Sequence, residues 1–337
     1  MSINVCIFGV SGYTGSTLLK LLNKHKNVNI VGVFGNSSVG KKIQDLFPNL
    51  LNLPDIEIRN YKNFDFGKTN LIFSCLPHGQ FQKEVFSNLN YENSIIDLSG
   101  DFRLDVKSEY ETFYKCKHTN FHQKKKFIYG LTEINRKEIS CSKFIANPGC
   151  YPTSVLIPLI PLLKEKINSH AHIVVDSKSG VSGAGKVLNE QNLFSELSNN
   201  FFSYGIANHK HFPEILQEMK KENLNVSLSF IPHLLPIFSG IQSNIYIDSE
   251  IIKAEEAFKI LKNFYQNEIF VKIFKNTVPK LSEVQNTNYI KIGVFSDILE
   301  KQTIIISMID NLFKGAAGQA IQNMNLMFGF NESESLV

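Results

Sequence analysis

Arginine, paired cysteines and long apolar runs are all scarce in this sequence. The 337-residue chain has only three arginines among its 35 basic residues, and five cysteines. The cysteines are odd in number and form no CxxC pair, which argues against a disulfide framework and a zinc site, so we expect no metal. No stretch approaches the roughly 18 apolar residues of a membrane span, and the N-terminus does not resemble a signal peptide. We therefore expect a cytoplasmic protein without a membrane partner.

The charge balance excludes a further class of partner. The net charge is +4, with 43% hydrophobic and 20% charged residues, which is typical of a globular protein. No block of Lys and Arg is combined with stacking aromatic residues, which argues against nucleic acid. The small basic excess suits small anionic ligands. A chain of this length can form two domains with separate cores.

The first half of the chain alternates short apolar segments with polar or helical ones. Apolar runs typical of strands occupy 3–8, 29–34, 70–75 and 94–99, and 15–25 has helical spacing. This β-α-β alternation predicts a parallel sheet with helices on both faces.

The second half has longer, alternating strands. They are expected at 172–180, 225–234, 243–248, 291–297 and 303–310. Mostly antiparallel strands with two or three helices would form an α+β domain. The last helical stretch, 315–328, is expected to dock on the first domain. The polar, basic segment 115–126 is expected to be a surface loop.

A glycine-rich turn follows the first predicted strand. Gly9, Gly12 and Gly15 are spaced as GxxGxxG rather than GxGxxG, between the strand and a helix. Glycines there permit a tight turn and the close approach of a pyrophosphate, which binds at the positive helix N-terminus. The turn alone is a weak signal, because packing can also require glycine. Its position favours dinucleotide binding.

The residues after the second predicted strand indicate which dinucleotide binds. An NAD enzyme usually has Asp or Glu there, to bind the ribose 2′-hydroxyl. This chain has Gly35-Asn36-Ser37-Ser38, with Lys41 and Lys42 just beyond. No carboxylate would repel a 2′-phosphate, and hydroxyl and ammonium groups could hold it, so we expect NADP(H). The alternative is an ordinary polar turn with solvated lysines.

One cysteine stands out from the other four. Cys150 belongs to the segment 147–153 (NPGCYPT), which lies where the two sequence patterns meet. Proline and glycine constrain a turn there, and the apolar run behind it looks helical despite two internal prolines. A helix N-terminus would favour the Cys150 thiolate. Cys6 and Cys75 lie within apolar strands and are interpreted as buried structural residues.

A thiolate nucleophile needs an acid–base partner, and 209–214 (HKHFPE) offers candidates. His209 and His211 share a face if the chain is extended, and Glu214 could orient one imidazole and keep it basic. A structural histidine pair is the alternative, and this ligand set is poor for a metal. His233 is a further acid–base candidate, although its apolar neighbours fit a buried, hydrogen-bonded role at least as well.

Motifs with these features extend over nearly the whole chain. They are GVSGYTG (9–15), LPHG (76–79), IDLSGDFRL (96–104), YGLTE (129–133), ANPGCYPT (146–153), SKSGVSGAGK (177–186), NHKHFPEI (208–215), PHLLPIFSGI (232–241) and DNLFKGAAGQAIQNMN (310–325). Together they resemble the N-acetyl-γ-glutamyl-phosphate reductases of arginine biosynthesis.

The resemblance implies an α/β fold similar to the glyceraldehyde-phosphate and aspartate-semialdehyde dehydrogenases. A Rossmann-like dinucleotide-binding domain would comprise 1–149 plus 312–337. An α+β catalytic and oligomerisation domain would comprise 150–311. The family also implies a homo-oligomer, either a tetramer or a dimer.

The resemblance further implies roles for individual residues. Cys150 resembles the nucleophile and His209 the acid–base residue. The positions that resemble the substrate site are Ser179, Gly180, Tyr204, His211 and Glu214. The positions that match the cofactor site are Gly9, Ser11, Gly12, Tyr13, Thr14, Gly15, Ser38, Leu76, Pro77 and Asn311.

Two positions depart from the family pattern. The family usually has arginine where this chain has Lys186 and Ser239. The first change keeps the charge but loses the bidentate geometry, and the second loses the charge. If those arginines hold the substrate's phosphate or carboxylate, this chain relies on Arg103, Lys186 or backbone amides. Arg103 and Lys186 are therefore added to the predicted substrate site.

The predicted reaction follows from these roles. The Cys150 thiolate would displace phosphate from the acyl phosphate, and hydride from NADPH would reduce the thioester. Protonated His209 would donate to the forming oxygen, releasing N-acetylglutamate semialdehyde. The partners would be these small molecules and inorganic phosphate. A related reductase for aspartyl or N-acetyl-aminoadipyl phosphate is the main alternative, because one methylene is worth only about 1–3 kcal/mol. A non-catalytic NADP-binding sensor is the other.

Overall fold

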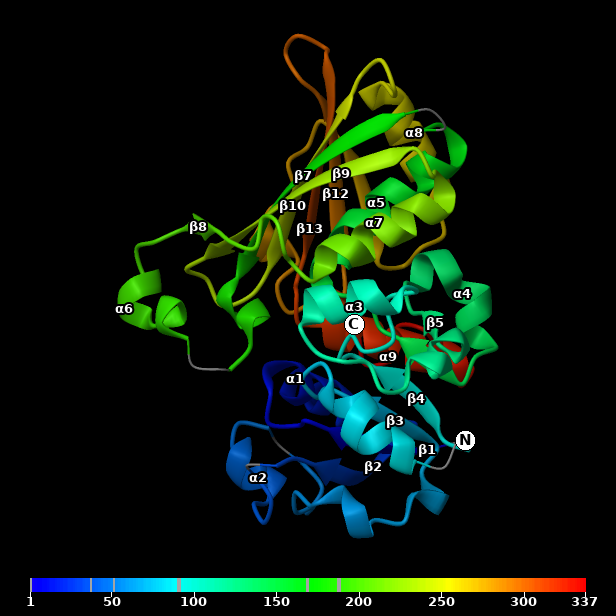
Figure 1. The fold of residues 1–337 in the computed structure, drawn as a ribbon, viewed down its shortest axis with the longest axis vertical. Coiled ribbons are helices and arrows are strands. Elements are labelled where there is room, and N and C mark those ends of the chain that lie inside the picture. The colour runs from blue at the N-terminus through cyan, green and yellow to red at the C-terminus, as the bar shows by residue number, and fades with distance from the viewer. Residues whose placement is uncertain (1, 37, 51, 90–91, 168–169, 187–188) are drawn as a thin grey trace. The chain divides into compact units, whose positions relative to one another are not determined.

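A computed structural model describes residues 2–36, 38–50, 52–89, 92–167, 170–186 and 189–337. The chain divides into two units (Figure 1). Unit 1 comprises 1–148 and 316–337, and unit 2 comprises 149–315. Within the described ranges, no helix is both long and apolar enough to cross a membrane.

The described part of unit 1 contains a six-stranded parallel sheet, with strand order β2-β1-β3-β4-β6-β5. Its strands are β1 (Ile3–Phe8), β2 (Val28–Phe34), β3 (Leu71–Ser74), β4 (Ser94–Asp97), β5 (Ile128–Tyr129) and β6 (Phe144–Ala146). The strand order reverses between β1 and β3. In open α/β sheets, ligands bind at the carboxyl ends of strands at such a reversal. The predicted glycine turn follows β1 directly, so it lies at this place.

The helices of unit 1 include the C-terminal helix of the chain. They are α1 (Tyr13–Leu22), α2 (Ile43–Leu46), α3 (Lys107–Tyr114), α4 (Thr132–Ser140) and α9 (Gly318–Met327). Helix α9 packs against α1 and α4. The hydroxyl of Thr132 in α4 donates to Oδ1 of Asn323 in α9 at 2.7 Å. These contacts make the last segment of the chain part of unit 1.

Much of the core of unit 1 is built from phenylalanine. Phe8, Phe34, Phe81, Phe86 and Phe102 are buried in one cluster with the ends of the strands. The ring of Phe102 stacks on that of Phe127, with centroids 4.0 Å apart. Such packing orders the carboxyl ends of β1 and β2, where Phe8 and Phe34 are the last strand residues.

The segment 115–126 differs from the predicted surface loop. Its second half, Phe121–Lys126, is a 3₁₀ helix, and His118 is buried. The His118 Nε2 atom lies 2.6 Å from the carbonyl oxygen of Asp101. Its ring also packs between those of Phe102, Tyr110 and Phe121. The many lysines of this segment predicted an exposed loop and gave no indication that His118 is buried.

The described part of unit 2 contains a seven-stranded mixed sheet, with strand order β11-β12-β13-β10-β7-β9-β8. The strands are β7 (Ala171–Gly180), β8 (Phe202–Ser203), β9 (Val226–Leu235), β10 (Ile241–Asp248), β11 (Val271–Lys275), β12 (Ile290–Ser296) and β13 (Gln302–Ile309). The pairs β7/β9 and β11/β12 are parallel, and the others are antiparallel.

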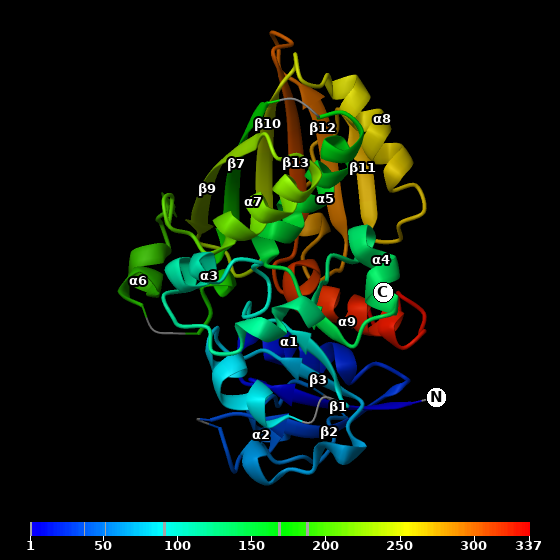
Figure 2. The ribbon, with the colours of Figure 1, turned by 45° about the vertical axis from the view of Figure 1, so that its right-hand side comes forward.

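Three helices cover one face of this sheet. They are α5 (Cys150–Glu165), α7 (His211–Glu222) and α8 (Ala254–Phe264), whereas the short α6 (Phe194–Leu197) projects away from it (Figures 1 and 2). Helix α5 packs on β10 and β13 and contacts both α7 and α8. It continues through Pro158 and Pro161, and it is buried from Tyr151 to Leu163. Its apolar composition on every side fits this central position.

Candidate active site

Cys150 is the first residue of α5, the central helix of unit 2. Its N-cap residue, Gly149, has extended φ and ψ angles of −69° and 157°. The thiol is therefore on the first turn of a sixteen-residue helix, where the partial positive charge of the backbone amides favours a thiolate. The predicted helix start is thus where the structure has it.

Two glycines bring other segments against the cysteine turn. A Cβ atom added to Gly149 would lie 2.6 Å from Nε2 of His211. One added to Gly315 would lie 2.8 Å from Cβ of Cys150. Only glycine permits both approaches without displacement. Gly315 was not among the predicted site residues, and its only signal in the sequence is its place in the motif 310–325.

Glu214 contacts the same turn. Its Oε1 atom accepts a 2.8 Å hydrogen bond from the backbone amide of Gly149, and the side chain is fully buried. The sequence analysis expected Glu214 to orient an imidazole and to bind substrate. The structure adds a different contact, through which the carboxylate holds the residue that precedes the nucleophile.

The two histidines of the 209–214 segment lie beside each other. Their ring centroids are 5.0 Å apart, and both side chains are more than nine-tenths buried. The ring of Tyr151 packs edge-on against both, at 5.5 Å from His209 and 5.9 Å from His211. Since Tyr151 follows Cys150 directly, the histidine pair flanks the cysteine turn. His211 is the first residue of α7.

Burial acts strongly on the charge state of His209. Burial lowers the pKa of His209 to about 3, with a smaller contribution from the positive charge of Lys210. The sequence analysis expected a basic, protonated imidazole. It could not anticipate the aromatic surroundings, which include Phe230, with its ring centroid 5.4 Å away. Desolvation disfavours the charged form there.

Two tyrosines complete this cluster. The hydroxyl of Tyr151 lies 3.3 Å from that of Tyr204 and donates to the carbonyl of His233 at 3.1 Å. Burial raises the pKa of Tyr204 to about 12, with the Cys150 thiol as a smaller cause in the same direction. Burial also raises the pKa of Tyr151. Both phenols are therefore neutral and able to donate. The sequence analysis missed Tyr151, whose signal was its position next to Cys150.

His233 points to the other face of the sheet. Along β9, Phe230 faces the helices and touches Tyr151 and His209. Side chains alternate between the two faces of a sheet along a strand, so His233, three residues later, faces away from the helices. Its Nδ1 atom lies 3.1 Å from Oδ1 of Asp176. This geometry places the His233 side chain on the other face of the sheet from His209 and His211, which favours the hydrogen-bonded role over the acid–base role.

Other predicted substrate residues lie at the end of β7. Ser179 is buried and its hydroxyl donates to the carbonyl of Gly180 at 3.0 Å. A Cβ on Gly180 would lie 2.8 Å from the carbonyl oxygen of Phe238. The side chain of Asn311 joins this loop, because its amide accepts from Gly240 and donates to Ser182, at 2.7 and 2.9 Å. Asn311 thus holds the two loops together.

The two departures from the family pattern have different surroundings. Ser239 is buried, and its hydroxyl donates to Oδ2 of Asp310 at 3.1 Å. Lys186 is exposed. Arg103, in unit 1, donates from Nε to the carbonyl of Asn147 at 2.7 Å and from Nη2 to that of Leu98 at 3.1 Å. The Arg103 guanidinium therefore supports the backbone that leads toward the cysteine turn.

The glycine turn in unit 1 has the form of a phosphate cradle. A Cβ on Gly9 would lie 2.6 Å from the carbonyl oxygen of Cys75, and one on Gly15 would lie 2.2 Å from that of Gly9. Gly12 is the N-cap of α1 and has no side chain to accept from the first helical amides, so a bound anion can take that place. Ser11, Tyr13 and Thr14 belong to the same turn.

Leu76 and Pro77 follow β3 beside this turn. The backbone amide of Leu76 would lie 3.2 Å from a Cβ on Gly9. Asp101 anchors the loop behind them, since its carboxylate accepts from the amides of Gly79 and Gln82 at 2.6 and 3.0 Å. Asp101 lies within the motif 96–104, but its role depends on contacts with residues about 20 positions away, which the motif does not show.

The predicted 2′-phosphate region is only partly described. Ser37 lies outside the described residues. Ser38 is buried, and its carbonyl accepts from the amide of Lys41 at 3.2 Å. Lys42 forms an exposed ion pair with Asp55 at 3.0 Å, and such pairs are weak and readily exchanged.

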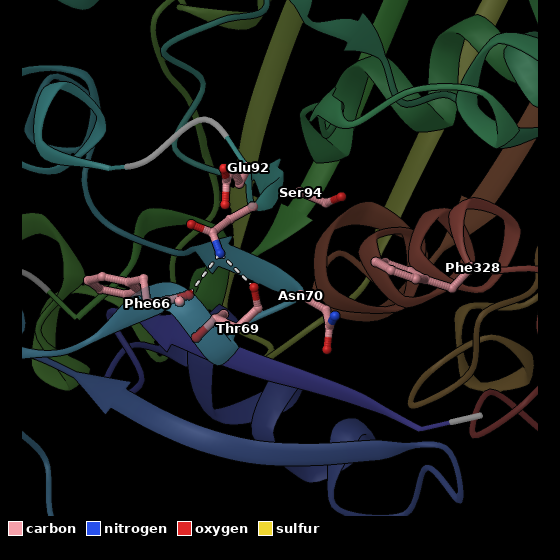
Figure 3. Close-up of a pocket in the computed structure, with 8 residues that line it drawn as sticks. Phe66, Thr69, Asn70, Glu92, Ser94 and Phe328 are labelled. Atoms are coloured by element: carbon pink, nitrogen blue, oxygen red, sulfur yellow. Dashed lines mark hydrogen bonds between the residues drawn. The ribbon is translucent and has the colours of Figure 1, made fainter.

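A separate pocket of about 310 Å³ lies in unit 1, at the amino ends of the strands of its parallel sheet (Figure 3). Its lining includes Asn70 and Ser94, at the amino ends of β3 and β4. The side-chain amide of Asn93 donates to the carbonyl oxygens of Phe66 and Thr69, at 3.1 and 2.5 Å. Dinucleotides bind at the carboxyl ends of such strands, so this pocket is not the cofactor site. No group of His, Cys, Asp and Glu among the described residues is arranged to hold a metal ion.

Comparison with known proteins identifies both parts of the chain. Residues 4–142 match the model of the semialdehyde dehydrogenase NAD binding domain, and residues 150–311 match that of the semialdehyde dehydrogenase dimerisation domain. The fold is similar to aspartate semialdehyde dehydrogenase II of Vibrio cholerae, with a TM-score of 0.75, 19% identity and coverage of 98% of this chain and 99% of that one. The Candida albicans aspartate semialdehyde dehydrogenase solved with NADP gives a TM-score of 0.68 at 15% identity, covering 97% and 99%.

Relatives with higher identity extend over the whole chain. The chain is 40% identical to a probable chloroplastic N-acetyl-gamma-glutamyl-phosphate reductase of Arabidopsis thaliana, over 99% of this chain and 84% of the relative. It is 41% identical to the N-acetyl-gamma-glutamyl-phosphate reductases of Methanosphaera stadtmanae and Campylobacter jejuni, over at least 99% of this chain and 97% of each relative. The chain therefore belongs to the N-acetyl-γ-glutamyl-phosphate reductases, within the semialdehyde dehydrogenase family.

Proposed function

We propose that this protein reduces N-acetyl-L-glutamyl 5-phosphate to N-acetyl-L-glutamate 5-semialdehyde and phosphate, with NADPH, in L-arginine biosynthesis. The observation that carries the proposal is Cys150 at the start of α5, flanked by the histidine pair, in a chain about 40% identical to reductases of this name. Cys150 attacks the acyl carbon, phosphate leaves with its electron pair, and a thioester remains.

The residues of unit 1 fit NADP(H). The turn from Gly9 to Gly15 leaves space for a pyrophosphate at the N-terminus of α1, and Leu76 and Pro77 lie next to it. No carboxylate follows β2 where it would repel a 2′-phosphate. When bound, the reduced nicotinamide supplies the hydride. We assign cofactor binding to 1–149 plus 312–337, and catalysis and oligomerisation to 150–311.

Substrate binding is assigned to the residues around the cysteine turn. Tyr204 and His211 lie in the same aromatic cluster as His209. Lys186 is exposed, and we assign it to the phosphate group, whereas the hydroxyl of Ser239 donates to Asp310. A Lys186→Gln variant is expected to raise the KM for phosphate in the reverse reaction by about tenfold, corresponding to about 1.4 kcal/mol.

The sheet of unit 2 offers a surface for a second copy of the chain. Its side chains opposite α5, α7 and α8 include half-buried apolar groups at Val174, Ile231, Ile304 and Ile306. No described helix of unit 2 covers this face. We assign it to homo-oligomer formation, with a tetramer as the expected state, which light scattering of the purified protein would measure. A cytoplasmic location stays a prediction, because plant relatives are named chloroplastic.

The first experiment is the phosphate-dependent reduction of NADP by N-acetylglutamate 5-semialdehyde. Wild type is compared with Cys150→Ala and with Cys141→Ala, a matched control on the surface of unit 1. Activity that needs phosphate, persists in Cys141→Ala and disappears in Cys150→Ala supports the proposal.

The same assay with the aspartate and N-acetyl-aminoadipate semialdehydes identifies the substrate. If kcat/KM is higher with one of these two semialdehydes than with N-acetylglutamate 5-semialdehyde, the corresponding acyl phosphate is the substrate. Tight NADP binding without activity on any of the three would favour the non-catalytic sensor.

A further inference from the structure

The backbone fixes which ring nitrogen of His209 carries a proton. The amide of His211 donates a 3.1 Å hydrogen bond to Nδ1 of His209. An N–H group can donate only to a nitrogen that has its lone pair available, so Nδ1 is unprotonated. A proton on Nδ1 would point at the amide proton of His211. The neutral imidazole therefore has its proton on Nε2, and the imidazolium would break this bond.

The surroundings of His209 disfavour the charged form independently of that bond. Its ring lies 5.0–5.5 Å from those of Tyr151, Tyr204, His211 and Phe230. The ionisable groups among these are two tyrosines whose pKa is raised, so that they are neutral, and His211. The positive charge of Lys210 also lowers the pKa of His209 and so opposes protonation. No carboxylate is among the causes that shift the pKa of His209.

The position of the ring relates it to the nucleophile. Tyr151 follows Cys150 and packs against His209, and the ring of Tyr204 lies 5.4 Å from that of His209, near enough to Cys150 for the cysteine to raise the pKa of Tyr204. The cluster that surrounds His209 is therefore adjacent to the residue that would carry the acyl group.

We propose that His209 acts as a neutral imidazole whose Nε2–H donates a hydrogen bond to the acyl oxygen on Cys150, with the backbone amide of His211 as the positioning group that sets this tautomer. This inference rests on the proposed function and refines the role of its acid–base residue. It replaces proton transfer from an imidazolium by stabilisation of an oxyanion.

The chemistry balances without a proton from His209. Hydride addition to the thioester carbon makes an alkoxide, and the C=O π electrons move to that oxygen. When the alkoxide collapses, the C=O bond re-forms, the C–S bond breaks, and its electron pair leaves on the Cys150 sulfur. The oxygen begins and ends as a carbonyl, so it needs a hydrogen-bond donor for its transient charge and no net proton. A neutral imidazole with a fixed Nε2–H supplies that donor, as in enzymes that polarise a carbonyl with neutral histidine.

The direct test is the protonation state of His209 in the protein without bound ligands. Nitrogen-15 NMR of labelled histidine distinguishes the Nε2–H form, the Nδ1–H form and the imidazolium, and the signal missing from His209→Gln identifies the residue. We expect the Nε2–H pattern, unchanged between pH 8 and pH 5. An imidazolium or Nδ1–H pattern at pH 7 would overturn the proposal. This readout does not depend on which substrate is reduced.

The kinetic test compares two variants. Glutamine offers an N–H donor near the position of Nε2 but cannot act as an imidazolium. We expect His209→Ala to lower kcat by about 10²–10³, the cost of removing an oxyanion donor, and His209→Gln to lower it by only about tenfold. Equal loss in both variants, with NADP binding and folding retained, would show that a proton donor is required. An inactive wild type would instead contradict the proposed function and leave the NMR result to decide the tautomer.

Discussion

The backbone amide of Gly149 donates a 2.8 Å hydrogen bond to Oε1 of Glu214, a residue 65 positions later in the chain. Glu214 lies in the first turn of α7, and Gly149 is the N-cap of α5. A buried carboxylate thus joins the histidine segment to the residue before the nucleophile. We expect this bond to help set the position of Cys150 relative to His209.

Replacing Glu214 by alanine is expected to lower both stability and the reactivity of Cys150. The Gly149 amide would lose its buried acceptor, which costs about 1–3 kcal/mol in the free energy of unfolding. Urea denaturation and the rate of Cys150 alkylation by iodoacetamide measure the two effects. Glu214→Gln keeps an acceptor oxygen and should stay closer to wild type.

Glu218, one turn later on α7, provides the matched control. It is also buried, but its Oε1 atom accepts from Lys221 and Gln217 rather than from the cysteine turn. Glu218→Ala should change stability without slowing alkylation. Equal alkylation rates in Glu214→Ala and wild type would contradict the positioning role of Glu214.

Gly149→Ala is expected to impair catalysis through His211. The backbone at Gly149 tolerates alanine, but the added methyl carbon would lie 2.6 Å from Nε2 of His211 and displace the ring. A shift of this size at a reacting group can lower the rate by about 10²-fold. In a His211→Ala background the same substitution has no ring to displace. A double-mutant cycle on kcat should therefore show strong coupling, and additive effects would contradict the contact.

Arg103→Lys is expected to act on stability rather than on substrate affinity. The guanidinium spans the carbonyls of Asn147 and Leu98, and an ammonium cannot reproduce both bonds. We expect the free energy of unfolding to fall by about 1–3 kcal/mol, so that the variant unfolds at a lower urea concentration. The KM for the semialdehyde should change little. Arg59→Lys, at an exposed position, serves as the control. A large rise in KM without a loss of stability would instead support the substrate-binding role predicted from the sequence.

The buried His209 predicts how stability depends on pH. Its pKa is lowered to about 3 in the folded protein, whereas an unfolded histidine has a pKa of about 6.5. Between these values the unfolded chain binds more protons, so stability falls as the pH falls below about 6.5. The slope from this residue approaches about 1.4 kcal/mol per pH unit at most. Burial also lowers the pKa of His25 and His118, so wild type keeps other contributions.

The comparison of wild type with His209→Gln isolates this contribution. As the pH is lowered from 7.5 to 5.5, the free energy of unfolding should fall more in wild type than in His209→Gln. A difference independent of pH would mean that His209 has the same pKa in the folded and unfolded chain, which would contradict the effect of burial.

The sequence alone determined the features that depend on neighbouring residues. Local residue spacing predicts the alternation of strands and helices. The backbone preferences of glycine and proline predict the turn after β1 and the helix start at Cys150. The full-length pattern of motifs also identified the family. The face on which His233 lies could also be predicted locally, because residues three apart on a strand, such as Phe230 and His233 on β9, point to opposite faces.

Only the tertiary structure decided what the site residues contact and how far burial shifts their pKa. Glu214 meets Gly149, Arg103 holds Asn147, and Gly315 packs on Cys150 because distant segments are brought together by the sheets and the central helix. The pKa of His209 depends on burial among rings from four places in the chain, and its tautomer depends on one backbone amide. Desolvation and hydrogen-bond geometry arise from the folded arrangement, so no local pattern in the sequence can specify them.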